Sequence, residues 1–370
     1  MKRPPGSIQD DRLKDLFRGM VDIYSPSGKE EEIVAFLADW LRREGLPVTL
    51  REVTEDRYNL EVVWPDAQPD VAFLGHVDTV PAFDIERYDF DEREGQIFGL
   101  GTADMKGGCA ALIEAFLSYV EGGNQPQRAG LFLVVGEEET GDGTSALLSE
   151  WRYPWAIVAE PTNLVPCLSH YSYVEMLVRA FGTRRHAAQA GHEYNAIFSM
   201  LRMLLRLAEW IEQEYPEAIL NIRDLHSSES GFAVPDGCAA WLDLHLPPQA
   251  PPEELSEGLE KLVQDSLAGS AVTRYEMGFP TLAKGYELPR EGLLPELLAT
   301  AYRDLDLDFA PGSFHSHSDA NLLWNADCQP VILGPGQLAK AHTRDESISF
   351  EQVARAARLY LAILRALHRT

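Results

Sequence analysis

Short runs of apolar residues alternate along the chain with longer helical segments. The apolar runs are three to five residues long and occur at 71–74, 131–135, 156–158 and 331–333. Runs of this kind suit strands that are buried on both faces of a sheet. Helices are predicted between or after them, at 107–120, 144–151 and 350–367. Strands that alternate with helices predict an α/β domain with a mostly parallel sheet covered by helices.

A further helix is predicted within residues 25–43. Ser27 and Glu30 have the spacing of a capping box, in which each side chain bonds the backbone N–H of the other residue. The apolar residues that follow fall on one helical face, which would pack against the core (Ile33, Phe36, Leu37, Trp40 and Leu41).

The middle of the chain has a different pattern. Apolar and polar residues alternate along 173–181 and 238–246, which predicts strands with one buried face. The predicted order is strand 173–181, helix 195–213, strands 217–223 and 238–246, helix 252–267 and strand 271–277. This βαββαβ order is typical of a small, ferredoxin-like four-stranded sheet with two helices. We therefore expect the α/β domain to comprise 1–170 and 281–370, interrupted by an inserted domain at 171–280.

Composition and charge exclude several classes of protein. The formal net charge is −26, whereas proteins that bind nucleic acids or anionic membranes need a basic face. No apolar run approaches the about 18 residues of a membrane-spanning helix, and no apolar stretch follows the basic N-terminus as in a secretory signal. The four cysteines are far apart and none forms a CxxC pair. A reduced, cytoplasmic protein is the simplest expectation.

Residues that commonly bind metal ions follow three of the predicted strands. His76 and Asp78 follow the first strand, Glu137, Glu138 and Glu139 follow the second, and Glu160 follows the third. In open α/β sheets the functional site lies beyond the carboxyl ends of the strands, so the three endings point to one place. One acidic residue after a strand usually belongs to a turn, but three such endings together favour a site.

Each of these segments has a plausible chemical role. His76 and Asp78 are two residues apart on extended chain, so Asp78 could fix the orientation of a metal-binding His76. Asp104 lies in a glycine-rich turn, GLGTADMKGG, which does not fit either common nucleotide-binding motif. Of the neighbours Glu137 and Glu138, one could hold a metal ion while the other acts as a base. Because Glu139 is also acidic, the assignment of these two roles is open by one residue along the chain.

Five motifs in order resemble the dinuclear zinc family of acetylornithine deacetylase, succinyl-diaminopimelate desuccinylase, aminoacylase and carboxypeptidase G. They are GHVDTVP, GLGTADMKGG, GEEETGDGT, AEPTN and GPGQLAKAHTRDE, and together they span most of the chain. The last motif looks most like acetylornithine deacetylase. The resemblance implies a catalytic α/β domain that is interrupted by a small dimerisation domain, and hence a homodimer.

The resemblance also implies roles for individual residues. Asp104 would bridge two zinc ions, for which cobalt may substitute. His76 and Glu160 would complete the site of one ion, and Glu138 and His342 that of the other. Glu137 would be the general base, because its spacing to Gly141 and Gly143 fits the family pattern, and Asp78 would orient His76. His186, in the inserted domain, would reach the site of a neighbouring subunit and stabilise the oxyanion.

The sequence departs from the family pattern at two places. Phe232 and His245 stand where the family often has an Asn and an Arg that bind the substrate carboxylate, and a His is a poor substitute for a bidentate guanidinium. Arg184, Arg185 or His245 could compensate. The second departure is SFHSHSD at 313–319, which looks like a further metal site. We favour a loop that caps a helix through Ser318, with His317 and Asp319 as candidate substrate contacts.

Together these observations predict a metal-dependent amidohydrolase. It would remove the acyl group from an N-acyl amino acid through attack of a metal-bridging water. The alternatives are a dipeptidase or carboxypeptidase, an enzyme like succinyl-diaminopimelate desuccinylase, and a non-catalytic binding homologue. The complete ligand set and the intact base argue against the last. The expected partners are a small N-acyl amino acid or short peptide and a second copy of the chain, without nucleic acid or membrane.

Overall fold

The computed structural model describes residues 6–82, 88–190, 195–229 and 231–369. The chain divides into two compact units. Unit 1 comprises Met1–Leu168, Leu288–Phe314 and Ser318–Thr370, and unit 2 comprises Ser169–Glu287 and His315–His317. The predicted insertion at 171–280 therefore lies inside unit 2, which extends further along the chain and takes in a second, short segment.

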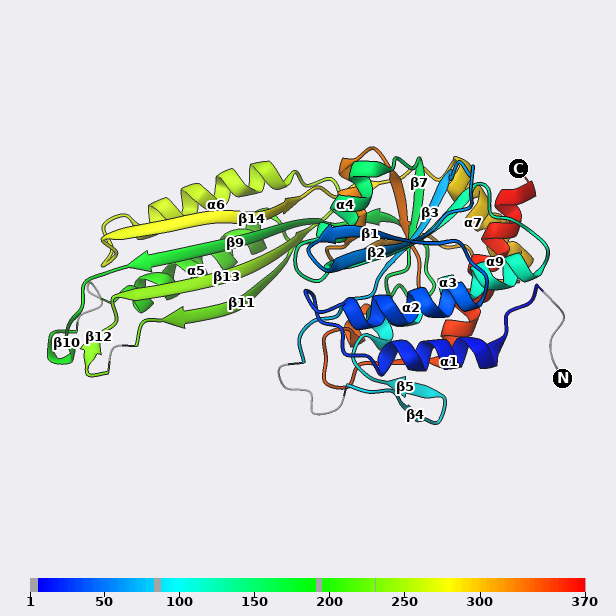
Figure 1. Ribbon diagram of the computed structural model, residues 1–370. Helices are drawn as coiled ribbons and strands as arrows, with labels where there is room; N and C mark the ends of the chain where they lie inside the picture. The colour runs from blue at the N-terminus through cyan, green and yellow to red at the C-terminus, as the bar shows by residue number, and fades with distance from the viewer. Residues whose placement is uncertain (1–5, 83–87, 191–194, 230, 370) are drawn as a thin grey trace. The chain divides into compact units, whose positions relative to one another are not determined.

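The centre of unit 1 is a mainly parallel sheet. Its strands run in the order β1-β2-β6-β3-β7-β17-β8. Figure 1 labels β1, β2, β3 and β7 of this sheet. The four middle strands are parallel neighbours: β6 (Ala129–Val134), β3 (Val71–His76), β7 (Trp155–Val158) and β17 (Gln329–Ile332). The flanking strands are antiparallel to their neighbours: β1 (Val48–Thr54), β2 (Arg57–Val62) and β8 (Cys167–His170). The predicted strands thus form the predicted α/β sheet.

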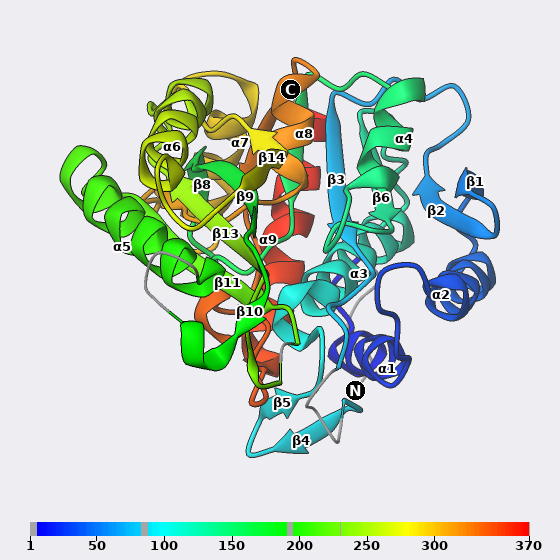
Figure 2. The same cartoon turned by 90° about the vertical axis from the view of Figure 1, so that its left-hand side faces the viewer.

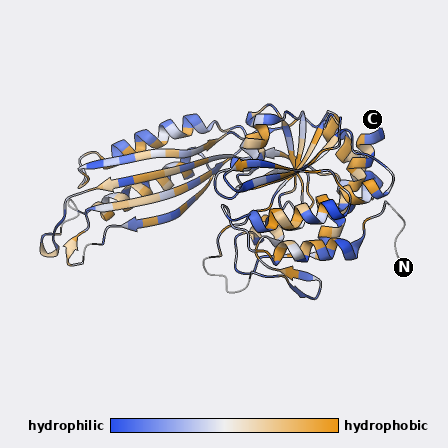
Figure 3. Cartoon of the chain, in the orientation of Figure 1, coloured by the Kyte–Doolittle hydropathy of each residue, from blue (hydrophilic) through white to orange (hydrophobic). Residues whose placement is uncertain are grey.

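Helices cover this sheet. Every residue of β3, β6 and β7 is buried, which requires cover on both faces. Helix α3 (Gly107–Glu121) contacts β3, β6 and α9 (Phe350–Arg369), and α4 (Asp142–Glu150) packs with α8 (Asp319–Asn325). The remaining helices are α1 (Asp10–Val21), α2 (Glu31–Arg43) and α7 (Leu293–Asp304). Helices α1 and α2 carry both hydrophobic and hydrophilic positions, as expected of helices with one buried face (Figure 3).

The remaining strands of unit 1 are short. β4 (Asp91–Arg93), β5 (Gln96–Phe98) and β18 (Ser347–Ser349) form a small antiparallel sheet, and β16 (Gly312–Phe314) pairs with β8. Strand β18 follows the loop that carries His342.

The predicted capping box at the start of α2 is wrong. Glu30 is the residue before α2, and no side chain of the described residues caps this helix. Ser27 Oγ donates instead to Asp78 Oδ2 at 2.7 Å, and Glu30 forms an ion pair with Arg57 at 2.8 Å. A hydrogen bond to an ionised partner is stronger than one to a neutral backbone group, so the tertiary contacts prevail over the local signal.

Unit 2 has the predicted βαββαβ order. The sheet order is β11-β13-β9-β14, and all neighbours are antiparallel. The elements are β9 (Ser172–Phe181), α5 (Ala196–Glu214), β11 (Ile219–Ser227), β13 (Gly237–Leu246), α6 (Pro252–Leu267) and β14 (Arg274–Ala283). Short strands β10 (Arg185–His186) and β12 (Ala233–Val234) pair with each other, and β15 (Tyr286–Glu287) pairs with the end of β8.

The core of unit 2 lies between its sheet and two helices. Alternate residues of β9 (Val174, Met176 and Val178) and of β13 (Leu242, Leu244 and Leu246) are buried against α5 and α6, as their alternation predicts. Both helices lie on this face of the sheet (Figure 2).

Two further expectations concern the reduced state of the cysteines and the absence of a membrane-spanning helix. All four cysteines are buried and free of disulfide bonds. None of the described helices combines the length and the apolar composition that crossing a bilayer demands.

Candidate active site

In unit 1, histidine and acidic residues of the kind that commonly bind metal ions lie at the carboxyl ends of parallel strands. His76 is the last residue of β3, Glu137 and Glu138 follow β6, and Glu160 follows β7. Because these strands are parallel neighbours, their ends share one edge of the sheet. The loop of Asp104 leads into α3, which approaches the Glu160 loop closely. A Cβ added at Gly108 would lie 2.3 Å from the carbonyl oxygen of Ala159, so only glycine fits there.

Five side chains form two groups that share one aspartate. The ligand atoms of His76, Asp104 and Glu160 lie within 4.8 Å of one another, and so do those of Asp104, Glu138 and His342. Asp104 Oδ1 is 3.3 Å from His76 Nε2, and Asp104 Oδ2 is 3.4 Å from His342 Nε2. The two oxygens of Asp104 therefore face different groups, which is the arrangement that a bridging carboxylate needs.

Glu137 and Glu138 face different partners. Glu138 Oε2 lies 3.0 Å from His342 Nε2, within the second group. Glu137 belongs to neither group, and its Oε2 is 3.8 Å from His76 Nε2. This placement matches the register in which Glu138 is the ligand and Glu137 the base, although the roles themselves stay predictions.

Asp78 contacts both His76 and the turn after β6. His76 Nδ1 lies 3.1 Å from the carbonyl oxygen of Asp78 and 3.5 Å from its carboxylate. The same carboxylate accepts backbone N–H bonds from Glu137 at 3.2 Å and Glu138 at 3.1 Å. Burial opposes its ionisation, but the contacts with His76 and Ser27 keep the pKa of Asp78 below its ordinary value. Ser27 was missed by the sequence analysis, because its spacing to Glu30 indicated a capping role.

The electrostatics of the site favour bound cations. Burial, together with the negative charges of Asp319 and Glu138, raises the pKa of Glu137 well above its ordinary value. Burial and the charge of Asp104 do the same for Glu160. Although burial lowers the pKa of His76, the surrounding carboxylates raise it well above its ordinary value. A set of imidazole nitrogens and carboxylate oxygens is the donor set of zinc and related divalent ions, so these residues fit two such ions.

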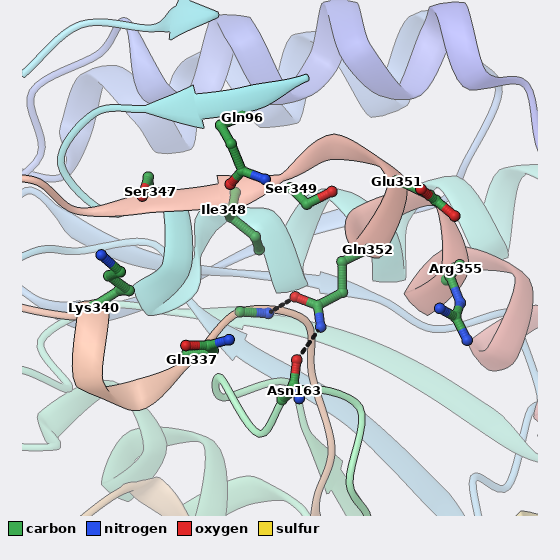
Figure 4. Close-up of a pocket in the computed structure, with 11 residues that line it drawn as sticks. Gln96, Asn163, Gln337, Lys340, Ser347, Ile348, Ser349, Glu351, Gln352 and Arg355 are labelled. Atoms are coloured by element: carbon green, nitrogen blue, oxygen red, sulfur yellow. Dashed lines mark hydrogen bonds between the residues drawn. The ribbon is translucent and has the colours of Figure 1, made fainter. Parts of the chain in front are cut away.

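The backbone of the loop that carries His342 is unusual at this residue. His342 has φ +57°, a left-handed conformation that is uncommon for residues other than glycine. Such conformations persist where the surrounding structure enforces them, often at functional sites. A polar pocket of about 300 Å³ lies beside this loop, lined in part by Gln337, Lys340 and Gln352 (Figure 4).

The other predicted site residues lie mostly in unit 2. Arg184, Arg185 and His186 are exposed, and His186 Nδ1 accepts a hydrogen bond from the backbone N–H of Ala188 at 3.2 Å. Phe232 is 93% exposed, so it has no packing role within the described chain.

The HxHxD segment divides between the units. His317 and His245 flank the ring of Tyr173, at 5.0 and 5.1 Å between centroids. Neither ligand group contains His315 or His317. Asp319 is buried in unit 1, and both of its carboxylate oxygens lack a hydrogen-bond partner among the described residues. Ser318 caps α8 as predicted.

Comparison with known proteins identifies the family. Residues 72–366 match the family described as Peptidase family M20/M25/M40. The chain belongs to this family. It is therefore a hydrolase, and the family resemblance that the five motifs indicated is confirmed.

Curated relatives match over most of their length. The acetylornithine deacetylase of Vibrio vulnificus is 27% identical over 376 residues, covering 91% of this chain and 93% of the relative. That of Edwardsiella ictaluri is 28% identical over 363 residues, covering 90% and 92%.

Solved structures share the fold. A tripeptidase from Staphylococcus aureus has a TM-score of 0.82 at 20% identity, covering 98% of this chain and 100% of that one. Human carnosine dipeptidase 1 has a TM-score of 0.81 at 14% identity, covering 98% and 97%. A dinuclear metal binding peptidase from Bacillus subtilis has a TM-score of 0.70 at 13% identity, covering 97% and 98%.

Proposed function

We propose that this hydrolase removes the acyl group from an N-acyl amino acid at a centre of two divalent metal ions. One observation carries the proposal: two ligand groups share Asp104, and a partly buried carboxylate that belongs to neither group, Glu137, lies beside them. The relatives named acetylornithine deacetylase support the choice of substrate class.

Zinc is the proposed metal, and cobalt a competent substitute. His76 and Glu160 would hold one ion, Glu138 and His342 the other, and Asp104 would bind both. Bound ions would polarise the amide carbonyl and make water a stronger nucleophile at neutral pH.

Glu137 is the proposed general base. As the water attacks the carbonyl carbon, Glu137 takes its proton and then passes that proton to the amide nitrogen, which leaves as the amine. The raised pKa of Glu137 suits a group that must both accept and return a proton. Asp78 would hold His76 in one orientation and, through two backbone N–H bonds, hold the turn that presents Glu137 and Glu138.

Residues of unit 2 are the proposed contacts to the rest of the substrate. His186 would stabilise the oxyanion in the site of a neighbouring subunit. Because Phe232 and His245 replace the expected carboxylate clamp, Arg184 or Arg185 is the proposed cationic partner of the substrate carboxylate. His245, His317 and Asp319 remain candidate contacts.

A substrate screen tests this function. The protein would be loaded with Zn²⁺ and assayed for amine release from N-acetyl amino acids including N-acetylornithine, N-succinyl-diaminopimelate and dipeptides. Preferred cleavage of an N-acyl amino acid would support the proposal. Cleavage confined to dipeptides, or to the succinylated compound, would replace it with one of the two enzyme alternatives, and inactivity on every class would refute it.

A homodimer formed through unit 2 is the proposed assembly. Strand β11 lies at one end of its sheet, and the neighbouring helix α5 carries a second apolar stripe besides its buried face, namely Phe198, Leu201 and Leu205. Leu205 is 66% exposed. An edge strand beside an exposed apolar stripe is typical of a surface that another chain covers.

The mass in solution tests the dimer. Leu205→Glu should weaken it, because a charge would be buried in the apolar contact. Leu282→Glu is the matched control, since Leu282 is 43% exposed on β14 at the other end of the sheet. Sedimentation should show a dimer for the wild type and the control, and a shift toward monomer for Leu205→Glu. A wild-type monomer would refute the assembly.

The cytoplasm is the proposed location. Four buried thiols without disulfide bonds are compatible with a reducing compartment. Fractionation of the native host that placed the protein outside the cytoplasm would contradict this.

A further inference from the structure

Glu346 is a buried carboxylate to which the sequence analysis assigned no role. It lies four residues after His342, and only 3% of its surface is exposed. Its Oε2 accepts the backbone N–H of Gly101 at 2.9 Å. Its Oε1 accepts the N–H groups of Ala103 at 2.8 Å and of Asp104 itself at 3.1 Å. The Glu346 carbonyl also accepts the N–H of Gly99 at 3.3 Å.

The loop of Asp104 cannot satisfy these N–H groups by itself. Gly101 has φ +78°, and Asp104 and Met105 have dihedral angles outside the helical range. This irregular backbone leaves N–H groups without the partners that a regular helix supplies, and buried N–H groups need partners. One carboxylate from a segment about 240 residues away in sequence provides three of them.

These bonds join the segments of two metal-binding residues. His342 and Glu346 are in one loop, in which the N–H of Glu346 also donates to the Thr343 carbonyl at 3.2 Å. Asp104 is in the other segment, and its two oxygens must each reach a different group. Metal–ligand distances in well-formed sites lie within about 0.2 Å of their standard values, so the position of the Asp104 backbone matters directly.

We propose that Glu346 is a positioning residue that fixes Asp104 relative to His342, so that one carboxylate can serve both metal ions. This inference rests on the dinuclear centre of the proposed function, but not on the choice of substrate. Glu346 would touch neither the metals nor the substrate and would act only through the backbone of Gly101–Asp104.

Gln352 also joins two loops through its side chain, but in a different setting from Glu346. Its amide accepts the N–H of Gly336 at 2.8 Å and donates to Asn163 Oδ1, so it also joins two loops of the site (Figure 4). These loops are already connected by backbone bonds, from Asn163 to Gly336 at 2.6 Å and from Leu164 to Gly334 at 3.0 Å. The junction at Gln352 is therefore duplicated. Backbone bonds also join the segments of Glu346 and Asp104, at Gly99 and between β5 and β18, but the N–H groups of Ala103 and Asp104 have the Glu346 carboxylate as their acceptor.

The test measures metal affinity rather than turnover. Wild type, Glu346→Ala, Glu346→Gln and the control Glu351→Gln would be titrated with Co²⁺ against a chelator, and the visible absorption of bound Co²⁺ would report its coordination. Glu351 is exposed in the first turn of α9, five residues after Glu346, so its substitution removes a charge nearby but outside the loop. We expect Glu346→Ala to lower the affinity for both ions by 10- to 100-fold, the usual effect of losing an outer-shell partner.

Glu346→Gln should fall between the wild type and Glu346→Ala. An amide has one acceptor oxygen, so its NH₂ group would face the N–H donors of one side of the loop. Exchange of the amide hydrogens at 101–104 should also be faster in metal-free Glu346→Gln than in the metal-free wild type. This variant decides the question if Glu346→Ala does not fold.

Wild-type affinity for both ions, with an unchanged Co²⁺ spectrum, in a folded Glu346 variant would overturn the proposal. A merely structural role would lower the melting temperature but leave affinity and spectrum unchanged, which also counts against it. Failure of the proposed function would look different, because the substrate screen would be negative while Co²⁺ binding still responded to Glu346.

Discussion

Replacing one carboxylate oxygen with an amide NH₂ group, at Glu137 or at Glu138, distinguishes the proposed base from the proposed metal ligand beside it. Glu137 belongs to neither ligand group, whereas Glu138 contacts His342 at 3.0 Å. Glu137→Gln should therefore keep both metals but lose about 10²- to 10⁴-fold in kcat, the usual share of general acid–base catalysis. This loss corresponds to roughly 2.7–5.4 kcal/mol of activation free energy, at about 1.36 kcal/mol for each factor of ten.

Glu138→Gln should have the opposite profile for metal binding. Among the described residues, it would leave Asp104 and His342 as the unaltered members of the second group. Loss of an outer-shell partner typically costs about 10- to 100-fold in metal affinity, and loss of a direct ligand should cost at least as much. Activity should fall at low metal concentration and recover in part when metal is added in excess.

Metal content and kcat would be measured on the same samples, after dialysis against a metal buffer of fixed free Zn²⁺. Glu139→Gln is the matched control, because Glu139 is exposed in the same turn. It should leave both quantities unchanged. If Glu137→Gln lost a metal ion and Glu138→Gln kept both ions but lost kcat, the assignment of base and ligand would be wrong by one residue.

Three further predictions concern the metals, a buried acid and the shared site. Chelation should abolish activity and Zn²⁺ or Co²⁺ should restore it; full activity in protein shown to be metal-free by elemental analysis would refute the mechanism. Burial raises the pKa of Asp319 from 3.8 to about 7 in the folded state. The folded state thus holds this proton more tightly than the unfolded chain does. The resulting contribution to the free energy of unfolding is roughly 4 kcal/mol, at about 1.36 kcal/mol per pKa unit, and it is lost as the pH rises from about 4 through 7. Asp319→Asn should remove this loss, and urea unfolding of the metal-free protein at pH 4 and pH 8 would detect it; an equal difference from wild type at both values would contradict it. Finally, Glu137→Ala and His186→Ala should each be nearly inactive, yet after subunit exchange half the dimers would be mixed and activity should reach about a quarter of wild type. No recovery in confirmed mixed dimers would mean that His186 does not act across the dimer.

Much of the fold follows from local pattern. The apolar runs at 71–74 and 156–158 lie in β3 and β7, the run at 131–135 ends one residue beyond β6, and the helix predicted at 252–267 has those bounds in the structure. Burial forces apolar residues onto one face or into one run, so this information is written locally. The convergence of His76, Glu137–Glu138 and Glu160 was also predictable, because the ends of neighbouring parallel strands must meet at one edge.

Other features of the site depend on segments that are distant in sequence. Ser27 has a local capping signal, yet it bonds Asp78, because the fold brings an ionised carboxylate to it. The motif around His342 includes Glu346, but nothing in the motif indicates that this side chain bonds the loop of Asp104. Residues 315–317 belong by their contacts to unit 2, although their neighbours on both sides belong to unit 1.

The sequence by itself thus predicted the parallel strands of unit 1, the helices that follow them, the βαββαβ order of unit 2 and the residues of the candidate metal site, but not the flanking strands β1, β2 and β8 or the helices α1 and α7. Only the tertiary structure decided which oxygen of Asp104 faces which histidine, which of two adjacent glutamates lies in a ligand group, and what holds the Asp104 loop in place. The physical reason is the separation along the sequence over which each effect acts. Periodicity reflects burial, which acts on each segment separately. Hydrogen bonds between irregular loops instead require donor–acceptor distances within a range of a few tenths of an ångström, and only the folded chain defines those distances.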